Sequence, residues 1–221
     1  MELQNVIQNR RSIRCFLSKP LSEETIRDLI NKSLWAPSWG NTQPWEIIVS
    51  TGASLEEFKR KNKEALLSGK PSSPEIPVPQ RWPDTLKKRY RNIGKRVFQS
   101  VSITKDDHEK KRQHFARMYA LFDAPALLLI IIDKGLSLEY SMLDIGLFLQ
   151  TFCLLAYDRD LGTCILSTAV MYPALAHTIF SIPETKLIVI GAALGWPNPD
   201  APINLFERER GKLEEFVRWL K

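Results

Sequence analysis

The sequence contains little that would support catalysis by its own side chains. Its 221 residues include three histidines and three cysteines, and the motifs GxGxxG, GxxxxGK[ST], HExxH and GxSxG are all absent. These absences argue against a dinucleotide fingerprint, a P-loop, a zinc protease helix and a serine nucleophile elbow. His108, His114 and His177 stand in polar or helical contexts that favour surface or capping roles. We therefore predict no catalytic side chain, and chemistry that depends on an organic cofactor.

Cysteines and long apolar runs are also scarce. Cys15, Cys153 and Cys164 are odd in number and form no CxxC pair, which argues against a disulfide framework and a structural metal site. The longest apolar runs cover residues 124–132 and 187–196, whereas a bilayer requires roughly 20 residues. The N-terminal residues do not resemble a signal peptide. We expect a cytoplasmic protein with no metal and no membrane contact.

The length and composition are those of an ordinary globular protein. With 44% hydrophobic and 25% charged residues, the chain suits one sizeable core, and we expect a single domain over residues 1–221. The net charge of +6 is unevenly distributed: residues 81–117 hold 12 Lys or Arg against 4 Asp or Glu, a local +8 that leaves −2 elsewhere. Such a segment either attracts nucleotides or nucleic acids or is a solvated excursion, and composition leaves both interpretations open.

Helical and strand patterns alternate along the chain. Ser22 is placed to cap a helix with apolar residues at helical spacing, and Ser54 opens a capping-box pattern. Residues 45–50, 126–132 and 187–190 have the composition of buried strands. Residues 139–157 predict a helix that is apolar on more than one face, and Pro173 can begin another. The alternation indicates an α+β or α/β core, interrupted by a proline-rich and basic excursion over residues 68–118.

Three segments carry polar groups that suit a phosphorylated heteroaromatic ligand. Residues 9–14, NRRSIR, place three guanidinium groups beside a hydroxyl, and residues 208–210, RER, form a second arginine cluster. Arginine offers a planar fork of donors to phosphate oxygens, although each cluster alone also fits a solvated arm. The loop APSWGNTQPW, residues 36–45, offers hydroxyl and amide groups to a ring, or is a tight helix-to-strand connection with tryptophans in the core.

Taken in order, five segments resemble the signatures of the nitroreductase superfamily. These are RRSIRCF with the helix after it, PSWGNTQPW, LGTCILS, GAALGWPNPDAPIN and the trailing RER. The resemblance covers both ends and the middle of the chain and leaves residues 68–118 as a variable excursion. It implies an α+β fold with a central mixed sheet flanked by helices, in which two chains intertwine as a homodimer that binds two FMN molecules.

The resemblance also implies roles for particular residues. Phosphate and ribityl contacts would come from Arg10, Arg11, Ser12, Arg14, Arg208 and Arg210. The partner subunit would present Pro37, Ser38, Asn41 and Gln43 to the flavin, and the backbone of Ile165, Leu166 and Ser167 would face its hydride-accepting nitrogen. No residue would act as acid or base. The implied reaction is a ping-pong transfer of two electrons from NAD(P)H to a nitroaromatic, a quinone or a similar small electrophile.

Two departures and three alternatives accompany this resemblance. Family members often carry a large polar or aromatic residue after the LGT turn, where this chain has Ile165 and Leu166, so redox tuning and substrate preference stay open. The family's polar ligand to the flavin pyrimidine has no secure counterpart, and the candidates are Arg81, Arg89 and Arg96. The alternatives are an enone reductase, dehalogenase or oxidase of the same fold, a flavin-binding protein without turnover, and a nucleic-acid-binding module, for which no reading motif is present.

Overall fold

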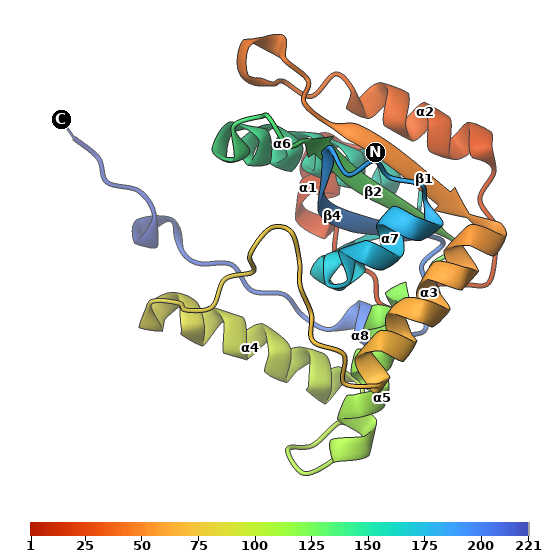
Figure 1. Ribbon diagram of the computed structural model, residues 1–221. Helices are drawn as coiled ribbons and strands as arrows, with labels where there is room; N and C mark the ends of the chain where they lie inside the picture. The colour runs from red at the N-terminus through yellow and green to blue at the C-terminus, as the bar shows by residue number, and fades with distance from the viewer. Residues whose placement is uncertain (221) are drawn as a thin grey trace.

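A four-stranded sheet in the order β1-β2-β4-β3 forms the centre of the computed structural model, which describes residues 1–220 (Figure 1). Its strands are β1 (Glu46–Thr51), β2 (Ala126–Asp133), β3 (Gly162–Leu166) and β4 (Lys186–Gly195). All three strand pairings are antiparallel, and the parallel component of the expected mixed sheet is one isolated bridge between Ser12 and Thr163. Continuous apolar runs predict strands covered on both faces but do not specify their direction.

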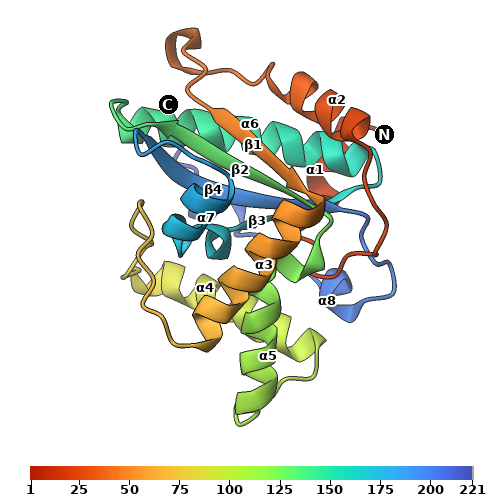
Figure 2. The same ribbon diagram turned by 45° about the vertical axis from the view of Figure 1, so that its right-hand side comes forward.

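Helices cover both faces of the sheet. Figure 2 shows α2 and α6 on one face and α3, α5 and α7 on the other. The helices are α1 (Leu3–Asn9), α2 (Glu23–Ser33), α3 (Gly52–Leu67), α4 (Asp84–Ser100), α5 (His108–Tyr119), α6 (Leu138–Asp158), α7 (Pro173–Ile179) and α8 (Pro202–Leu205), with 3-10 turns at Trp39–Asn41, Leu121–Asp123, Ser167–Val170 and Leu213–Glu215. This is the α+β architecture that the sequence predicted.

The alternating side chains of β2 divide between two hydrophobic cores. Leu127 and Leu129 pack into the core that contains Phe58 of α3. Leu128 and Ile130 pack into the core that contains Phe148 of α6. Because successive side chains of a strand point to opposite faces, the apolar run of β2 supplies both cores, as its composition predicted.

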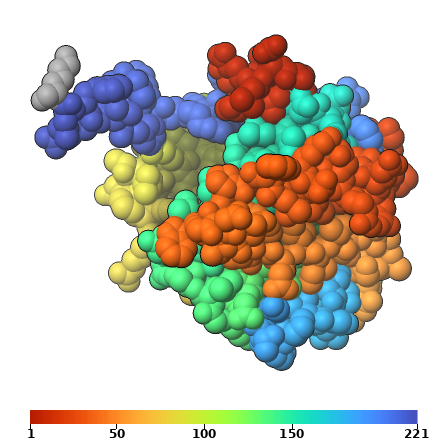
Figure 3. All heavy atoms as spheres, turned by 90° about the horizontal axis from the view of Figure 1, so that it is seen from above, coloured from red at the N-terminus to blue at the C-terminus, as the bar shows by residue number. Residues whose placement is uncertain are grey.

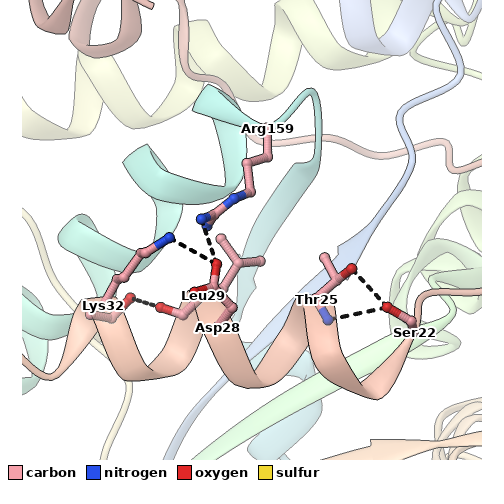
Figure 4. Close-up of polar contacts among 7 residues, drawn as sticks. Ser22, Thr25, Asp28, Leu29, Lys32 and Arg159 are labelled. Atoms are coloured by element: carbon pink, nitrogen blue, oxygen red, sulfur yellow. Dashed lines mark hydrogen bonds and ion pairs between the residues drawn. The ribbon is translucent and has the colours of Figure 1, made fainter.

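The predicted helix after Ser22 is present, and Figure 4 shows how it begins and how it is attached. The Ser22 hydroxyl accepts a hydrogen bond from the backbone N–H of Thr25 at 3.1 Å. One turn later the Asp28 carboxylate forms ion pairs with the ammonium group of Lys32, at 3.0 Å, and with the guanidinium group of Arg159, at 2.5 Å. Since Arg159 directly follows α6, this carboxylate joins α2 to the end of α6.

One predicted boundary differs from the structure, and one predicted connection is confirmed. Helix α3 begins at Gly52, whose φ of 58° suits glycine, and not after a cap at Ser54. The Ser54 hydroxyl instead lies 3.0 Å from the Ser50 hydroxyl, because the turn from β1 into α3 brings the two together. Residues 68–80, predicted to be irregular, form no helix or strand, and the basic part of the excursion that follows them forms α4 and most of α5.

Two parts of the chain expose apolar side chains. Helix α6 exposes Tyr140, Leu143 and Leu147 although its other side lies in the core. By length and composition α6 could cross a membrane, a test that buried core helices also pass. Residues 206–220, which we call the C-terminal arm, run past α4 and stand off the sheet and its helices (Figures 1 and 3). The arm exposes Phe216 and Trp219.

Candidate functional site

The two arginine clusters meet beside the edge strand β3. The segment after α1 is held against this strand by the bridge between Ser12 and Thr163 and by a hydrogen bond of 2.9 Å from the Ile13 N–H to the Thr163 carbonyl oxygen. The C-terminal arm approaches the same segment from α8. Together they enclose a cavity of about 180 Å³, which we call the arginine pocket, lined by Arg10, Arg11, Ser12, Arg14, Ile93, Asn204, Phe206, Arg208 and Arg210.

The positive charge of the arginine pocket is not neutralised by the protein. Within residues 1–220, none of its five guanidinium groups lies within 4.0 Å of a carboxylate. Burial, followed by repulsion from Arg11, Arg210 and Arg10, lowers the pKa of Arg208. Such a concentration of unpaired guanidinium donors suits a doubly charged phosphate, which accepts charge-assisted hydrogen bonds from them.

The arginines differ in how their donors are used. The Arg208 guanidinium donates to the carbonyl oxygens of Gln8, at 2.6 Å, and Arg10, which are orphan carbonyls at the end of α1. Arg11 donates to the Asn204 carbonyl oxygen at 2.7 Å. In contrast, the Arg10 guanidinium has no hydrogen-bond partner within residues 1–220, and Arg210 donates only to the carbonyl of its neighbour. Arg10 therefore has the most donors free for an anion, whereas Arg11, Arg14 and Arg210 each use one donor and Arg208 uses two.

The C-terminal end of β3 lies beside the segment that lines the arginine pocket. Thr163 pairs with Ser12, and two residues further along the same face Ile165 is 45% exposed. Leu166 is buried, and Ser167 begins a 3-10 turn with an exposed side chain. The structure thus exposes one apolar side chain, Ile165, two residues along β3 from the pairing of Thr163 with Ser12.

The side chains with nucleophilic or acid–base potential are engaged elsewhere. Burial raises the pKa of the Cys164 thiol to about 11, which leaves it protonated and unreactive. His177 contacts the Ile182 carbonyl at 2.9 Å and Glu75 at 3.2 Å. His114 packs edge-on against Phe98. The packing of His114, half-buried among aromatic rings, differs from the surface or capping role expected for it.

The loop with Pro37, Ser38, Asn41 and Gln43 lies far from the arginine pocket of the same chain. The loop leads into β1, whose first residue, Glu46, pairs with Ile131 near the end of β2. Thr163, beside the arginine pocket, pairs with Leu194, and Leu194 pairs with Ala126 at the start of β2. The two sites therefore lie at opposite ends and opposite edges of the sheet, on the order of 20 Å apart from strand dimensions. The loop is instead tied to α6, since the Trp39 N–H donates to Asp144 at 3.0 Å.

Two of the three candidates for a pyrimidine ligand in the basic excursion contact the C-terminal arm. Arg89 pairs with Glu215 at 2.6 Å and lies 4.8 Å from the centre of the Phe216 ring. Arg96 pairs with Glu209 and lies 3.7 Å from Glu207. Arg81 is exposed. In this chain, therefore, α4 holds the arm through Arg89 and Arg96.

Three residues that line the arginine pocket were not predicted from the sequence: Asn204, Ile93 and Phe206. Asn204 stands in the recognised segment GAALGWPNPDAPIN, so its position was visible, but its burial was not. Ile93 lies in the basic excursion, where one apolar residue among charges gives no signal. The Phe206 ring lies 5.8 Å from the Arg14 guanidinium, a contact between residues from opposite ends of the chain.

Comparisons with known proteins identify the family of the chain. The model of the Nitroreductase family matches residues 7–196. The chain is 30% identical to the nitrobenzene nitroreductase of Ectopseudomonas oleovorans, covering 99% of this chain and 96% of that protein. It is 31% identical to the 4-nitrobenzoate reductase of Pseudomonas putida, covering 97% and 94%.

Solved structures give the same result. The FMN and NADPH-dependent nitroreductase NfnB from sphigopyxis sp. strain HMH superposes with a TM-score of 0.96 at 25% identity over 100% of both chains. The FMN-dependent nitroreductase NfnB from Mycobacterium smegmatis, in complex with NADPH, superposes with a TM-score of 0.93 at 21% identity over 99% of this chain and 97% of that one. At that identity the likeness concerns the fold.

Proposed function

Because the chain belongs to the nitroreductase family, we propose that it is an FMN-dependent oxidoreductase that passes two electrons from NAD(P)H to a small electrophile. The names of the relatives, nitrobenzene nitroreductase and 4-nitrobenzoate reductase, favour nitroaromatic compounds as acceptors. The observation that carries the proposal is the arginine pocket, with five guanidinium groups and no carboxylate partner within residues 1–220.

FMN fits this arrangement. We assign the phosphate and the ribityl chain to Arg10, Arg11, Ser12, Arg14, Arg208 and Arg210, and the ring to the end of β3 at Ile165, Leu166 and Ser167. When bound, FMN supplies the hydride-transfer chemistry that the histidine-poor sequence lacks. The protein would bind FMN, orient it and exclude water from the site. A backbone N–H beside the reacting nitrogen would favour negative charge on the ring.

We further propose that the enzyme is a cytoplasmic homodimer of single-domain subunits. The loop with Pro37, Ser38, Asn41 and Gln43 is too distant to reach the arginine pocket of its own chain, so a partner must supply it. The exposed apolar side chains of α6 and of the C-terminal arm form the kind of surface that a subunit interface covers. Helix α4 buries only Val97, and since most helical stability in proteins comes from tertiary packing, we expect a partner subunit to cover part of this helix.

The test is spectroscopic. The purified protein should be yellow, NADPH should bleach it in the absence of oxygen, and 4-nitrobenzoate should restore the colour. The double variant Arg10→Ala/Arg210→Ala, purified in parallel, should be colourless after dialysis. A colourless wild-type protein that does not take up added FMN would contradict the proposed function, and colour that NADH and NADPH leave unchanged would contradict the enzyme assignment.

A further inference from the structure

We propose that Asn204 is a positioning residue that holds the two halves of the arginine pocket at the spacing a phosphate requires; this inference rests on the function proposed above. Asn204 lies in α8 and is 3% exposed. It is a neutral side chain in a pocket otherwise dominated by cations, so its contribution is geometric.

The Asn204 amide uses its donors and its acceptor to join the two ends of the chain. Its oxygen accepts a hydrogen bond from the backbone N–H of Arg14 at 2.8 Å. Its nitrogen donates to the carbonyl oxygens of Cys15 at 2.7 Å and Asn198 at 3.0 Å. An amide has two N–H donors and one oxygen, and each of them is engaged here.

The backbone of the same residue adds a fourth link. The Asn204 carbonyl oxygen accepts a hydrogen bond from the Arg11 guanidinium at 2.7 Å. Arg11 and Arg14 precede Asn204 by 193 and 190 residues. These bonds therefore connect segments from nearly opposite ends of the sequence. Arg208 and Arg210 follow directly along the arm. Asn204 therefore sets where the arm starts relative to the N-terminal cluster.

No other residue type of this size supplies the same set of bonds. Aspartate would keep the acceptor for the Arg14 N–H but present lone pairs to the carbonyls of Cys15 and Asn198. It would also place a carboxylate among the arginines. Alanine would leave the half-buried Asn198 carbonyl and Arg14 N–H without this partner, and the Cys15 carbonyl would keep only the Asn198 N–H. Asparagine satisfies the backbone of both segments without neutralising the pocket.

The experiment compares FMN with riboflavin, which lacks the phosphate. Apoprotein is titrated with each, following flavin fluorescence, for wild type, Asn204→Ala, Arg210→Ala and the double variant. Asn204→Ala should weaken FMN about tenfold and change riboflavin affinity less than about threefold. In the Arg210→Ala background, the same change should have a smaller effect on FMN, since the two residues act through one geometry.

Asn198→Ala is the matched control. The Asn198 side chain lies in the same loop but accepts a local bond, from the Asp200 N–H at 3.0 Å, and it should leave the ratio of FMN to riboflavin affinity unchanged. If Asn204→Ala does not fold, Asn204→Ser is measured in the same way. Equal weakening of both flavins, unchanged FMN affinity, or full additivity with Arg210→Ala would overturn the positioning role. A wild type that binds neither flavin would overturn the proposed function instead.

Discussion

The guanidinium group of Arg208 donates to the main-chain carbonyl oxygen of Arg10, 198 residues earlier in the chain. The same group holds the Gln8 carbonyl, so Arg208 fastens the C-terminal arm to the end of α1. Both ends of the sequence thereby contribute cations to one pocket. The pocket arginines look equivalent in the sequence, but this contact gives Arg208 a structural role in addition to the phosphate-binding role proposed for Arg10 and Arg210.

The arginines should respond differently to removal. Arg10→Ala and Arg210→Ala should each weaken FMN roughly ten- to hundredfold, since each removes charge-assisted bonds worth about 1.5–3 kcal/mol. Neither should lower the melting temperature of the apoprotein, because losing one cation relieves repulsion. Arg208→Ala should lower both FMN affinity and apoprotein stability, since two carbonyls lose their donor. Flavin titration and thermal melting measure this, and identical behaviour of all three variants would refute the separation of roles.

Leu143 tests the dimer interface. Its side chain is 59% exposed on α6, so Leu143→Asp costs the isolated subunit little. Burying that carboxylate without a partner in an interface is strongly unfavourable. We expect the variant to be a folded monomer with reduced FMN occupancy, because the loop around Ser38 would come from the partner. Light scattering and circular dichroism measure this. Lys63→Asp, on the exposed side of α3, is the control and should stay dimeric, whereas a dimeric Leu143→Asp protein would refute the interface placement.

His114 should make stability depend on pH. Burial, followed by repulsion from Arg117 and Arg14, lowers the pKa of His114 below its ordinary value of 6.5. Between that lowered pKa and 6.5 the unfolded chain binds more protons than the folded one, so stability rises with pH. The contribution is present above pH 6.5 and is lost as the pH falls through the folded pKa.

Denaturant unfolding of His114→Gln between pH 5 and 7 measures this contribution. The variant should lose part of the pH dependence that the wild type shows over this interval, whatever its absolute stability. His108→Gln, at an exposed histidine, is the control and should keep the wild-type slope. Parallel curves for the wild type and the His114 variant would exclude His114 as the source.

Helix α4 should assist the approach of NAD(P)H. Lys87 and Lys88 have no carboxylate partner within residues 1–220, whereas Arg89 is paired with Glu215. Lys87→Gln/Lys88→Gln should slow bleaching by NADPH more at low salt than at high salt, since the screening length falls from about 30 Å at 0.01 M to about 8 Å at 0.15 M. Stopped-flow absorbance measures the rate. Lys61→Gln/Lys63→Gln on α3 removes the same charge as a control. If both double variants respond alike, α4 is a solvated surface helix.

Several elements were evident from the sequence because their signals are local. The apolar run of β2, the cap at Ser22 and the proline that starts α7 each depend on neighbouring residues, and each appears close to the predicted place. The helix over residues 139–157 was likewise predicted, and its excess of apolar faces corresponds to exposed side chains such as Leu143. Where a turn joined two elements, as at Gly52, local patterns placed the N-cap at Ser54, three residues after the observed N-cap at Thr51.

The sequence by itself determined the chemistry of the candidate site: two arginine clusters, a polar loop and too few histidines for acid–base catalysis. Only the tertiary structure decided which of these meet. The clusters converge because the bridge between Ser12 and Thr163 and the bonds of Asn204 bring the chain ends together. The polar loop stays apart because β1 and β3 are opposite edges of one sheet. Contacts separated by nearly 200 residues depend on how the elements pack, and no local pattern of residues encodes that packing.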